Sequence, residues 1–555
     1  MSFHWSLRAA ACLAAALFVT PAQPVKTTIG AGAGDYARLF TSLENMLLKA
    51  QRKQTVLGRE RLVFVPWIRD QVHTTKAMKY LAPDVRSLLE LYLETQTSDG
   101  LYFDYFEPLT RNTNLRLNAF ERRYWHIFPR ENLQMVRLPV EADLEYLLVE
   151  GVYYYWQSTG DKAFLAKWVP ALERGMAYAM TDPLRWSKKY LLVKRGYTID
   201  TWDFLQLPKP RTEYTSGEEL QSGIFNIGPG TPMGIMHGDN TGMYAGCVQL
   251  AAMQRALGDE LAAKAWEAQA ETLRHRMNRV LWNGKFYSHF VEDDPKPSYL
   301  KADLRNQLSL SNAYDVNRGV PTEPMAESIV QTYLDLKRQA EGKSFAEWYG
   351  LYPPVEPDYA GYAPGTYTNG GILTCVAGEL AKAAFQHGFE EYGADILRRV
   401  LALVDKHDGT LPHTYRPDGT VDRGIPDNWG QAAIYSAIVE GLAGLVDRGV
   451  LFEHAEVSPR WMAAGVKDVD VTIAYGPSSK KVTYNYRQDE AKRTITLRLD
   501  GDAARYTVRL MVPNASVQAL VDGKETASRV EQLRNTRYVV LDAVAGGPRT
   551  VSVRY

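Results

Sequence analysis

Apolar positions across residues 36–452 recur at helical spacing, in long segments separated by connectors rich in Gly, Pro and Tyr. Residues 140–156 form one such segment, the turn STGD follows, and the next segment puts Trp168, Leu172 and Met176 on one face. The same layout recurs around the turns LGDE and HGFE. The pattern predicts helical hairpins with short turns at one end and long connectors at the other.

Hairpins of this kind can stack in two ways, as a closed ring or as an open solenoid. The connectors differ in length and the chain has no strict repeat period, which argues against a solenoid. We therefore predict a closed ring over residues 23–457. Its short turns would gather at one mouth, and its long polar and aromatic connectors would build a cleft at the other.

The periodicity changes after residue 457. Segments such as DVDVTIAYG, RTITLRL and RTVSVRY alternate polar and apolar residues, with Gly, Asn or Asp between them. This alternation predicts an antiparallel β-sandwich over residues 458–555. The stretch VSPRWM, residues 457–462, is the expected hinge between the two domains.

The N-terminus has the pattern of a secretion signal. Arg8 precedes the apolar run AAACLAAALFV, and small residues ending at Ala22 offer a cleavage site. The run is too short to span a membrane, so we predict no membrane insertion. Residues 1–22 are therefore expected to be a signal peptide, and the protein to be secreted or periplasmic.

Charge and cysteine content narrow the function. The chain has 64 basic and 64 acidic side chains, and this balance does not favour nucleic acid as a partner. A neutral or weakly charged substrate, bound by hydrogen bonds and stacking, is expected instead. Cys247 and Cys375 lie in apolar helical segments and are predicted to be buried thiols, with a disulfide as the alternative. There is no CxxC or HExxH pattern, so neither a metal nor a cofactor is predicted.

Nearly every long connector places an acid beside Trp or Tyr. The candidates, in chain order, are Trp67, Arg69, Asp70, His73, Glu141, Asp143, Asp200, Trp202, Asp203, His237, Asp239, Asn240, Asp358, Tyr362, Tyr367, Asn369, His413, Tyr415, Asp427, Asn428 and Trp429. Cleavage of a glycosidic bond needs one acid to protonate the leaving oxygen and another to activate water, while sugar faces stack on aromatic rings.

Purely structural explanations exist for several of these acids. Asp239 and Asp427 precede helices and fit the role of N-cap residues. Glu141 in a first helical turn complements the helix dipole. Arg69 and Asp70 suit a local ion pair. These explanations do not account for the repeated pairing of acids with aromatic residues.

Three motifs resemble those of the six-hairpin glycosidases, which include glucoamylases, processing α-glucosidases and α-L-rhamnosidases. WIRD (residues 67–70) is similar to an element that helps to hold the non-reducing sugar. GTYTNGGI (365–372), with Asn369, looks like the Y-x-N-G-G element before an inner helix, and DNWGQAAIYSAIVEGLAGL (427–445), with Trp429, looks like the last barrel helix. The resemblance implies a mainly α (α/α)6 toroid, followed by a β-domain like that of rhamnosidase-like members.

The stretch TIDTWDF (198–204) is similar to the E-S-G-W-D segment of processing α-glucosidases, which ends in the general acid. Matching W-D to W-D implies that Asp203 is the general acid, Trp202 a stacking platform and Asp200 an orienting or sugar-binding acid. The spacing between the two acids is one residue shorter here, so Asp200 and Asp203 can exchange roles.

The general base departs from the family pattern. Glucoamylase-like members carry it as Glu in an L-P-E-Q-like segment, whereas the similar segment here reads TLPHTYRP, with His413 in the place of that Glu. Asp427 is the best substitute, followed by Glu356 and Asp358, with Glu141 as a further candidate. A missing base is also compatible with a phosphorylase, although secretion argues against that.

The sequence therefore predicts a secreted glycoside hydrolase that needs no cofactor and cleaves oligo- or polysaccharides by an exo-acting, inverting mechanism. Two alternatives stay open. A polysaccharide lyase would use His73, His237 or His413 with nearby tyrosines to act on a uronate. A non-catalytic glycan-binding protein would keep the stacking residues without a productive acid pair.

Overall fold

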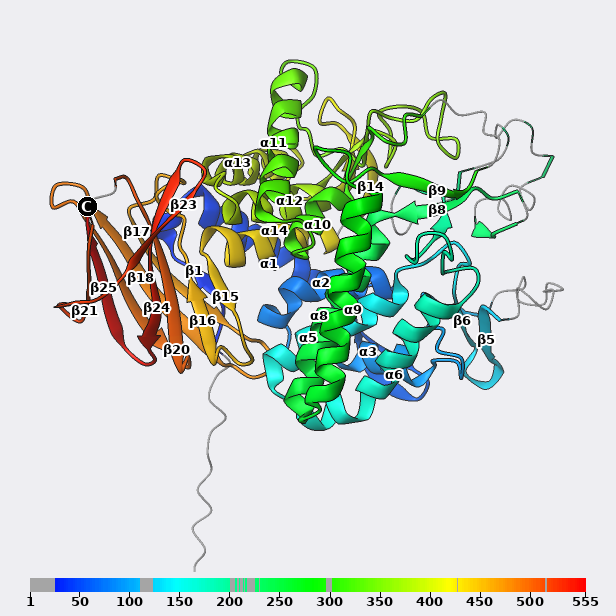
Figure 1. Cartoon of the computed structure of the whole chain (residues 1–555), viewed down its shortest axis with the longest axis horizontal. Coiled ribbons are helices and arrows are strands. Elements are labelled where there is room, and N and C mark those ends of the chain that lie inside the picture. The colour runs from blue at the N-terminus through cyan, green and yellow to red at the C-terminus, as the bar shows by residue number, and fades with distance from the viewer. Residues whose placement is uncertain are drawn as a thin grey trace, which may run out of the picture.

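The computed structural model describes residues 25–109, 123–199, 230–295, 302–426, 428–514 and 517–555, and short pieces between 205 and 228. Figure 1 shows a helical part, and beside it a strand-rich part formed by the C-terminal residues. Within the described residues, no helix is both long and apolar enough to cross a membrane.

The predicted hairpins are confirmed for three helix pairs. These pairs are α5 (Leu144–Thr159) with α6 (Lys162–Thr181), α8 (His237–Leu257) with α9 (Glu260–Val280), and α12 (Thr374–Gln386) with α13 (Glu390–Lys406). The first two turns share their chemistry. Gly160 and Gly258 end a helix in the left-handed conformation, and the Asp that follows each accepts a hydrogen bond from the first turn of the next helix.

Six helices of the described chain contact one another in a cyclic order, and α14 packs against both α12 and α2. In that order they are α2 (Ile68–Leu81), α5, α8, α10 (Ser311–Asn317), α12 and α14 (Asn428–Ser436). The other helices pack against these six: α1 (Asp35–Ala50), α3 (Ser87–Glu94), α6, α9, α11 (Glu323–Ala340) and α13.

Burial distinguishes the two sets of helices. Nearly every residue of α12 is buried, as expected for a helix that is surrounded by others. By contrast, α9 buries only Ala263, Ala270, Leu273 and Met277, which lie at helical spacing on one face. The first set therefore lines the inside of the helical part and the second set covers it.

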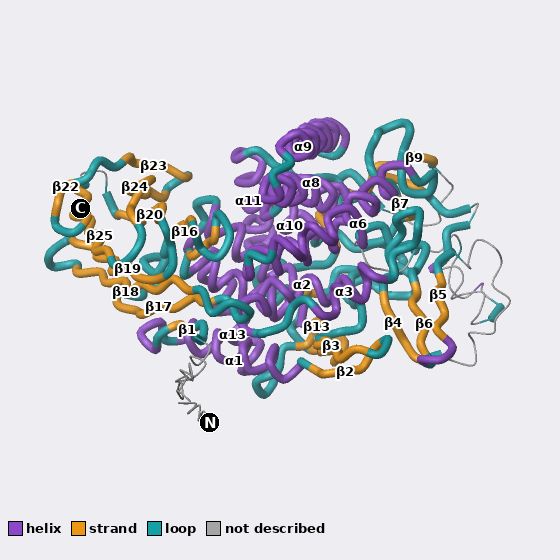
Figure 2. Tube along the Cα trace, turned by 90° about the horizontal axis from the view of Figure 1, so that it is seen from below, coloured by secondary structure: helices purple, strands orange, loops and turns teal. Residues whose placement is uncertain are grey.

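Short strands flank the N-terminal ends of the inner helices. They form the small sheets β4-β6-β5, β7-β8-β9, β10-β11 and β12-β13-β14, besides the hairpin β2-β3. Their bounds are β2 Arg52–Val56, β3 Arg59–Val63, β4 Tyr105–Pro108, β5 Trp125–Phe128, β6 Leu133–Val136, β7 Arg195–Gly196, β8 Met233–Met236, β9 Phe290–Asp294, β10 Leu308–Ser309, β11 Leu351–Tyr352, β12 Ile372–Leu373, β13 Pro412–Tyr415 and β14 Val421–Pro426. Figures 1 and 2 place β5, β6 and β9 at the end away from the C-terminal strands.

The C-terminal part contains two sheets, with strand orders β1-β17-β18-β19-β25-β21-β22 and β15-β16-β20-β24-β23. The bounds are β1 Thr28–Ile29, β15 Leu445–Asp447, β16 His454–Val457, β17 Asp468–Ala474, β18 Lys481–Asp489, β19 Thr494–Gly501, β20 Arg505–Val512, β21 Gln518–Val521, β22 Lys524–Glu525, β23 Arg529–Leu533, β24 Thr536–Ala545 and β25 Arg549–Arg554. The strands with the clearest predicted alternation are all present.

The described strand pairs within residues 458–555 are all antiparallel, in agreement with the prediction. A parallel pair forms between β16 and β20, and β16 precedes that range. The chain between them forms β17, β18 and β19 in the other sheet, and this long crossover permits parallel pairing. Strand pairing also extends beyond residues 458–555. It takes in β15 and β16 before residue 458, and β1 from the N-terminal region.

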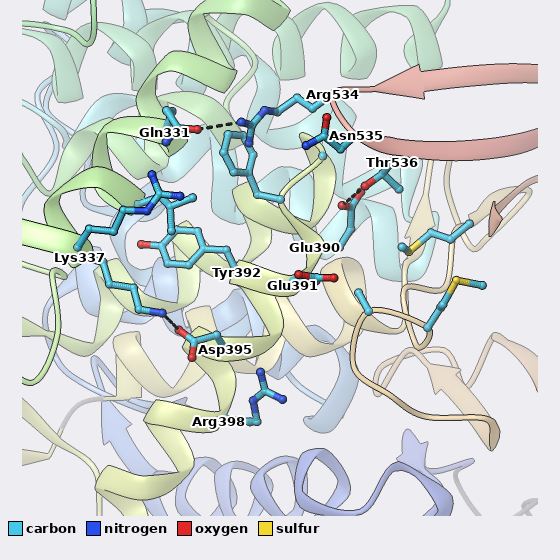
Figure 3. A pocket seen from close by; sticks show the side chains of 17 residues that line it. Gln331, Lys337, Glu390, Glu391, Tyr392, Asp395, Arg398, Arg534, Asn535 and Thr536 are labelled. Carbon is cyan, nitrogen blue, oxygen red and sulfur yellow. Dashed lines mark hydrogen bonds and ion pairs between the residues drawn. The ribbon is translucent and has the colours of Figure 1, made fainter. Parts of the chain in front are cut away.

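Side-chain contacts join the two parts at the short-turn end of the helices. Glu390, at the start of α13, accepts hydrogen bonds from Thr536 and Tyr538 of β24, and Arg534 lies 3.6 Å from the centroid of the Phe389 ring. A cavity of about 750 Å³ opens along this seam. Figure 3 shows Glu390, Arg534 and Thr536 around it.

A buried charge network lies inside the helical part. Glu440, on the π-helical turn Ala437–Leu442, accepts hydrogen bonds from Lys79 Nζ at 3.1 Å and Tyr80 Oη at 2.9 Å, and it also pairs with Lys382. Burial alone would raise the pKa of Glu440, but Lys382 and Lys79 hold that pKa below its ordinary value. The ionised carboxylate therefore stabilises the fold above its unfolded-state pKa and loses that contribution in acid.

We expect Glu440→Gln to lower the free energy of unfolding at pH 7 by about 3–5 kcal/mol, because it removes the carboxylate that pairs with the buried ammonium of Lys79 and the partly buried ammonium of Lys382. The deficit relative to wild type should shrink below about pH 4, where the wild-type carboxylate loses its advantage. Urea unfolding at several pH values measures both effects. Glu267→Gln, in a surface pair between Glu267 of α9 and Arg255 of α8, is the control and should cost less than about 1 kcal/mol. Equal losses in the two variants would contradict the stabilising role of Glu440.

Candidate functional site

Arg69 is the centre of a buried ionic cluster. It lies in the first turn of α2 and is 2% exposed. Its Nε and Nη2 atoms donate to the two carboxylate oxygens of Asp143 at 2.6 and 3.0 Å, and Nη2 also donates to Glu141. Asp104 Oδ1 lies 4.0 Å from Nη2. One guanidinium thus gathers three carboxyl groups from two connectors, one before β4 and one before α5.

Local backbone structure brings these acids to Arg69. Asp104 directly precedes β4, and its backbone carbonyl accepts a hydrogen bond from the N–H of Ile68, at the start of α2. Glu141 and Asp143 directly precede α5, which begins at Leu144 and not at about residue 140 as predicted. Asp143 is the N-cap residue of α5, and its backbone carbonyl accepts from the N–H of Leu147. Its side chain does not cap the helix, and Arg69 holds the side chains of both acids at the helix entrance.

A second buried ion pair lies next to this cluster. Arg195 of β7 donates to Asp239, in the first turn of α8, at 3.3 Å, and both side chains are fully buried. The charge of Arg195 also acts on Glu141, which couples the two groups. The entrances of α2, α5 and α8 are thus lined by one continuous set of charges.

Burial shifts the acids of this set towards their protonated forms. It raises the pKa of Asp104 to about 7 and that of Asp239 to about 6, although Arg69 and Arg195 oppose the shift. Burial also raises the pKa of Glu141 well above its ordinary value. Carboxyl groups with such pKa values can donate or accept a proton near neutral pH.

Several oxygens of these acids have hydrogen-bonding capacity left. Both carboxylate oxygens of Asp104, Oε1 of Glu141 and Oδ2 of Asp239 are buried and make no hydrogen bond to the described residues. Buried acceptors of this kind are normally satisfied by water or a ligand. Sugar hydroxyl groups are suitable donors. Within the described residues, no group of three or more His, Cys, Asp or Glu is arranged to hold a metal ion.

Two predicted tryptophans are described near the helix entrances. Trp67, just before α2, is half-buried and stacks on Tyr105 with ring centroids 4.0 Å apart. Trp429, in the first turn of α14, is buried and stacks on His73 of α2 at 4.2 Å, with the ring planes 4° apart. The second stack joins the last inner helix to the first.

The structure separates the predicted residues into three groups. The first group, Arg69 and Glu141, lies in the buried cluster. The second group has other surroundings: Asp70 and His413 are partly exposed. Asn369 is buried, and its amide bonds the backbone of Val355 and Tyr362, so it serves to hold the connector before α12.

The third group lies outside the described residues. It consists of Asp200, Trp202, Asp203 and Asp427. The chain on either side is described for both stretches. Ile199 is held by a hydrogen bond from its N–H to the hydroxyl of Tyr359, and β14 leads to residue 426 before α14 begins at Asn428.

Some residues of the site were not predicted. Asp104 is the third acid near Arg69, and Arg195 is the partner of Asp239. Asp315 and Ser309 were not predicted either. Both bond the predicted candidate His237, Asp315 Oδ2 at 2.5 Å from Nδ1 and Ser309 Oγ at 2.7 Å from Nε2, and the Asp315 contact ties α8 to α10. Asp104 lies in YFDYF, an acid between aromatic residues, and this local signal matches the pattern that marked the other connectors. Cys247 and Cys375 are both buried, as predicted.

Comparison with known proteins identifies the type of domain. Residues 236–421 match the family model described as the mannosylglycerate hydrolase MGH1-like glycoside hydrolase domain. No curated protein sequence matches the chain.

Two solved rhamnosidase structures share the fold at low sequence identity. An α-L-rhamnosidase from Dictyoglumus thermophilum aligns with a TM-score of 0.55 and 12% identity, over 93% of this chain and 49% of that chain. A GH78 family rhamnosidase of Bacillus sp. GL1 aligns with a TM-score of 0.56 and 14% identity, over 86% and 42%. A GH63 mannosylglycerate hydrolase from Thermus thermophilus aligns with a TM-score of 0.47 and 16% identity, over 72% and 100%.

The chain spans about half the length of the two rhamnosidases. The family model and the shared fold confirm the predicted resemblance to six-hairpin glycosidases. The matched domain is a glycoside hydrolase domain, in agreement with the predicted enzyme class.

We expect Asp104→Asn to change how stability depends on pH. The pKa of Asp104 in the folded protein, about 7, exceeds its ordinary value near 4. Folding therefore favours the proton, and this residue makes wild type less stable as pH rises from about 4 to 7. Asn has no such charge. The unfolding free energy of the variant, relative to wild type, should rise by roughly 2–4 kcal/mol between pH 4 and 8.

Asp99→Asn is the matched control for that measurement. Partial burial acts to raise the pKa of Asp99, but hydrogen bonds from Thr97 and Arg123 outweigh it and lower that pKa. Asp99→Asn should therefore change the pH dependence of the unfolding free energy in the opposite direction. The effect should stay below about 1 kcal/mol because the pair is exposed. Denaturant unfolding at pH 4, 6 and 8 tests both variants. A pH-independent difference between Asp104→Asn and wild type would show that the carboxyl group titrates normally.

Proposed function

We propose that the protein is a glycoside hydrolase whose active site lies at the N-terminal ends of the inner helices. The observation that carries this proposal is the cluster of buried carboxyl groups around Arg69 and Arg195 at those ends. The family match supports it, because residues 236–421 include Asp239 and the α12 entrance. The cyclic helix contacts support a six-hairpin (α/α)6 barrel as the scaffold.

In the proposed mechanism, Asp203 protonates the glycosidic oxygen and Asp427 activates water from the opposite face of the sugar. Inversion of this kind requires the two carboxyl groups to be roughly 6.5–9.5 Å apart, which leaves room for the water. Both residues belong to connectors whose described ends lie beside helix entrances, after β7 and before α14. Asp200 and Trp202 would orient and stack on the sugar.

The buried cluster has a binding role in this mechanism. Asp104, Glu141 and Asp239 offer acceptors for sugar hydroxyl groups, while Arg69 fixes the position of two acids, Asp143 and Glu141. Hydroxyl groups that replace water at such acceptors give specificity, since an analogue that lacks one leaves a buried oxygen unsatisfied. A site enclosed by several connectors favours exo action on the end of an oligo- or polysaccharide.

The N-terminal pattern of residues 1–22 supports secretion or a periplasmic location, and this stays part of the proposal. An extracellular enzyme of this kind would meet polysaccharides directly.

We expect Asp203→Asn to lower kcat/KM for glycoside hydrolysis by about 10²–10⁴-fold, because Asn cannot donate the proton. The assay is release of reducing sugar from nitrophenyl glycosides and from plant and bacterial polysaccharides. Asp408→Asn is the control. It replaces an exposed turn residue at φ 52°, a conformation that Asn tolerates, and should leave hydrolysis unchanged.

Different outcomes separate the competing functions. Full activity in Asp203→Asn would contradict its assignment as the acid. A product that absorbs in the ultraviolet would identify a lyase. Glycan binding without turnover of any substrate by wild type would identify a binding protein.

A further inference from the structure

Arg423 is a cation in a rigid aromatic clamp. It lies on β14, and its guanidinium carbon is 4.8 Å from the ring centroid of Tyr362 and 4.6 Å from that of Tyr367. Nη2 donates a hydrogen bond to Tyr362 Oη at 2.5 Å. The side chain is half-buried, and within the described residues no carboxylate forms an ion pair with it. The two rings therefore hold a positive charge that can attract an anionic ligand.

Two acids on the segments that carry the clamp, Asp422 and Asp358, are engaged elsewhere. Asp422 accepts from the backbone N–H of Tyr367 at 2.8 Å and from Arg416 Nε at 3.3 Å. Asp358 accepts from the backbone N–H of Gly361 at 2.8 Å. These contacts shape the connector around the clamp, and the guanidinium of Arg423 keeps nitrogens that can donate to a ligand.

The connector that carries the tyrosines is held in place by Asn369. Its amide group bonds the backbone of Val355 and the carbonyl of Tyr362. Together with the Asp422 contact to Tyr367, this arrangement keeps both rings around Arg423. Because the guanidinium is already oriented, little side-chain entropy is lost when it binds a ligand.

The clamp lies at the same end of the helical part as the proposed active site. Tyr367 is 6.4 Å from His413, measured between ring centroids, and β14 leads directly into α14. Tyr352 of β11 stacks on Tyr349 at 5.0 Å and is 38% exposed, and β11 pairs with β10, the strand just before α10. Aromatic rings and the cation of Arg423 thus lie together at this end of the helical part, which we call the rim.

We propose that Arg423 binds the carboxylate of a uronic acid residue in the substrate. The inference rests on the proposed function for the position of the glycan, which would run from the rim to the buried cluster. A planar guanidinium fork matches a carboxylate, and tyrosine rings suit the C–H faces of a sugar. The chain has no net charge, so an acidic sugar would be recognised by this local contact and not by the general field of the protein.

The test compares acidic glycans with their neutral counterparts. Oligosaccharides from glucuronoxylan and from pectin, each with its carboxyl-reduced form, are titrated calorimetrically into wild type, Arg423→Gln and Arg487→Gln. Arg487 is the matched control, an exposed arginine on β18 of the C-terminal strands. Wild type and Arg487→Gln should bind the acidic member of at least one pair about 10–100-fold more tightly. Arg423→Gln should bind both members of that pair nearly equally.

An unchanged preference in Arg423→Gln would overturn the inference, as would a wild type that does not discriminate within either pair. Hydrolysis of the same pairs separates this inference from the proposed function. Arg423-dependent preference in binding without hydrolysis would refute the hydrolase and support the acidic ligand. Hydrolysis of acidic and neutral members at the same rate would support the hydrolase and refute the role of Arg423.

Discussion

The pairing of Arg69 with Asp143 and Glu141 is the constraint on which the site depends. It joins the entrance of α2 to the entrance of α5, and Arg69 and Asp143 are 74 positions apart in the chain. Three acids around one guanidinium leave an excess of buried negative charge, with Arg195 nearby. The positive end of the α5 dipole and the raised pKa values of Asp104 and Glu141 both reduce that excess. The carboxyl groups of the site can therefore adopt either the protonated or the ionised form.

The two ends of the helical part have different tasks. At the short-turn end, Glu390 and Arg534 attach the C-terminal strands, and the cavity there lies along a seam of satisfied contacts. At the other end, long connectors bring acids, aromatic rings and Arg423 together. Such a division suits a scaffold in which short turns give rigidity and long connectors give chemistry.

Much of the fold could be predicted from the chain, because hairpins and strands are recorded in local periodicity. Turns such as STGD and LGDE carry their own chemistry in Gly and Asp. The partners of Arg69 were harder to predict. A local pair with Asp70 was one interpretation, whereas the structure pairs Arg69 with Asp143. Contacts this distant in sequence leave no periodic signal. For the same reason Arg195 was missed, whereas Asp104 stands in YFDYF, a local signal of the kind that marked the other connectors. Asn369 was predicted to bind sugar, and its amide holds the backbone.

The most direct test of the proposed site is a crystal structure of the protein with an oligosaccharide bound. We expect a sugar ring at the helix entrances, with hydroxyl groups donating to Asp104, Glu141 or Asp239 and with Asp203 beside the glycosidic oxygen. A sugar bound only in the seam between α13 and β24, with no sugar at the carboxyl cluster, would contradict the assignment.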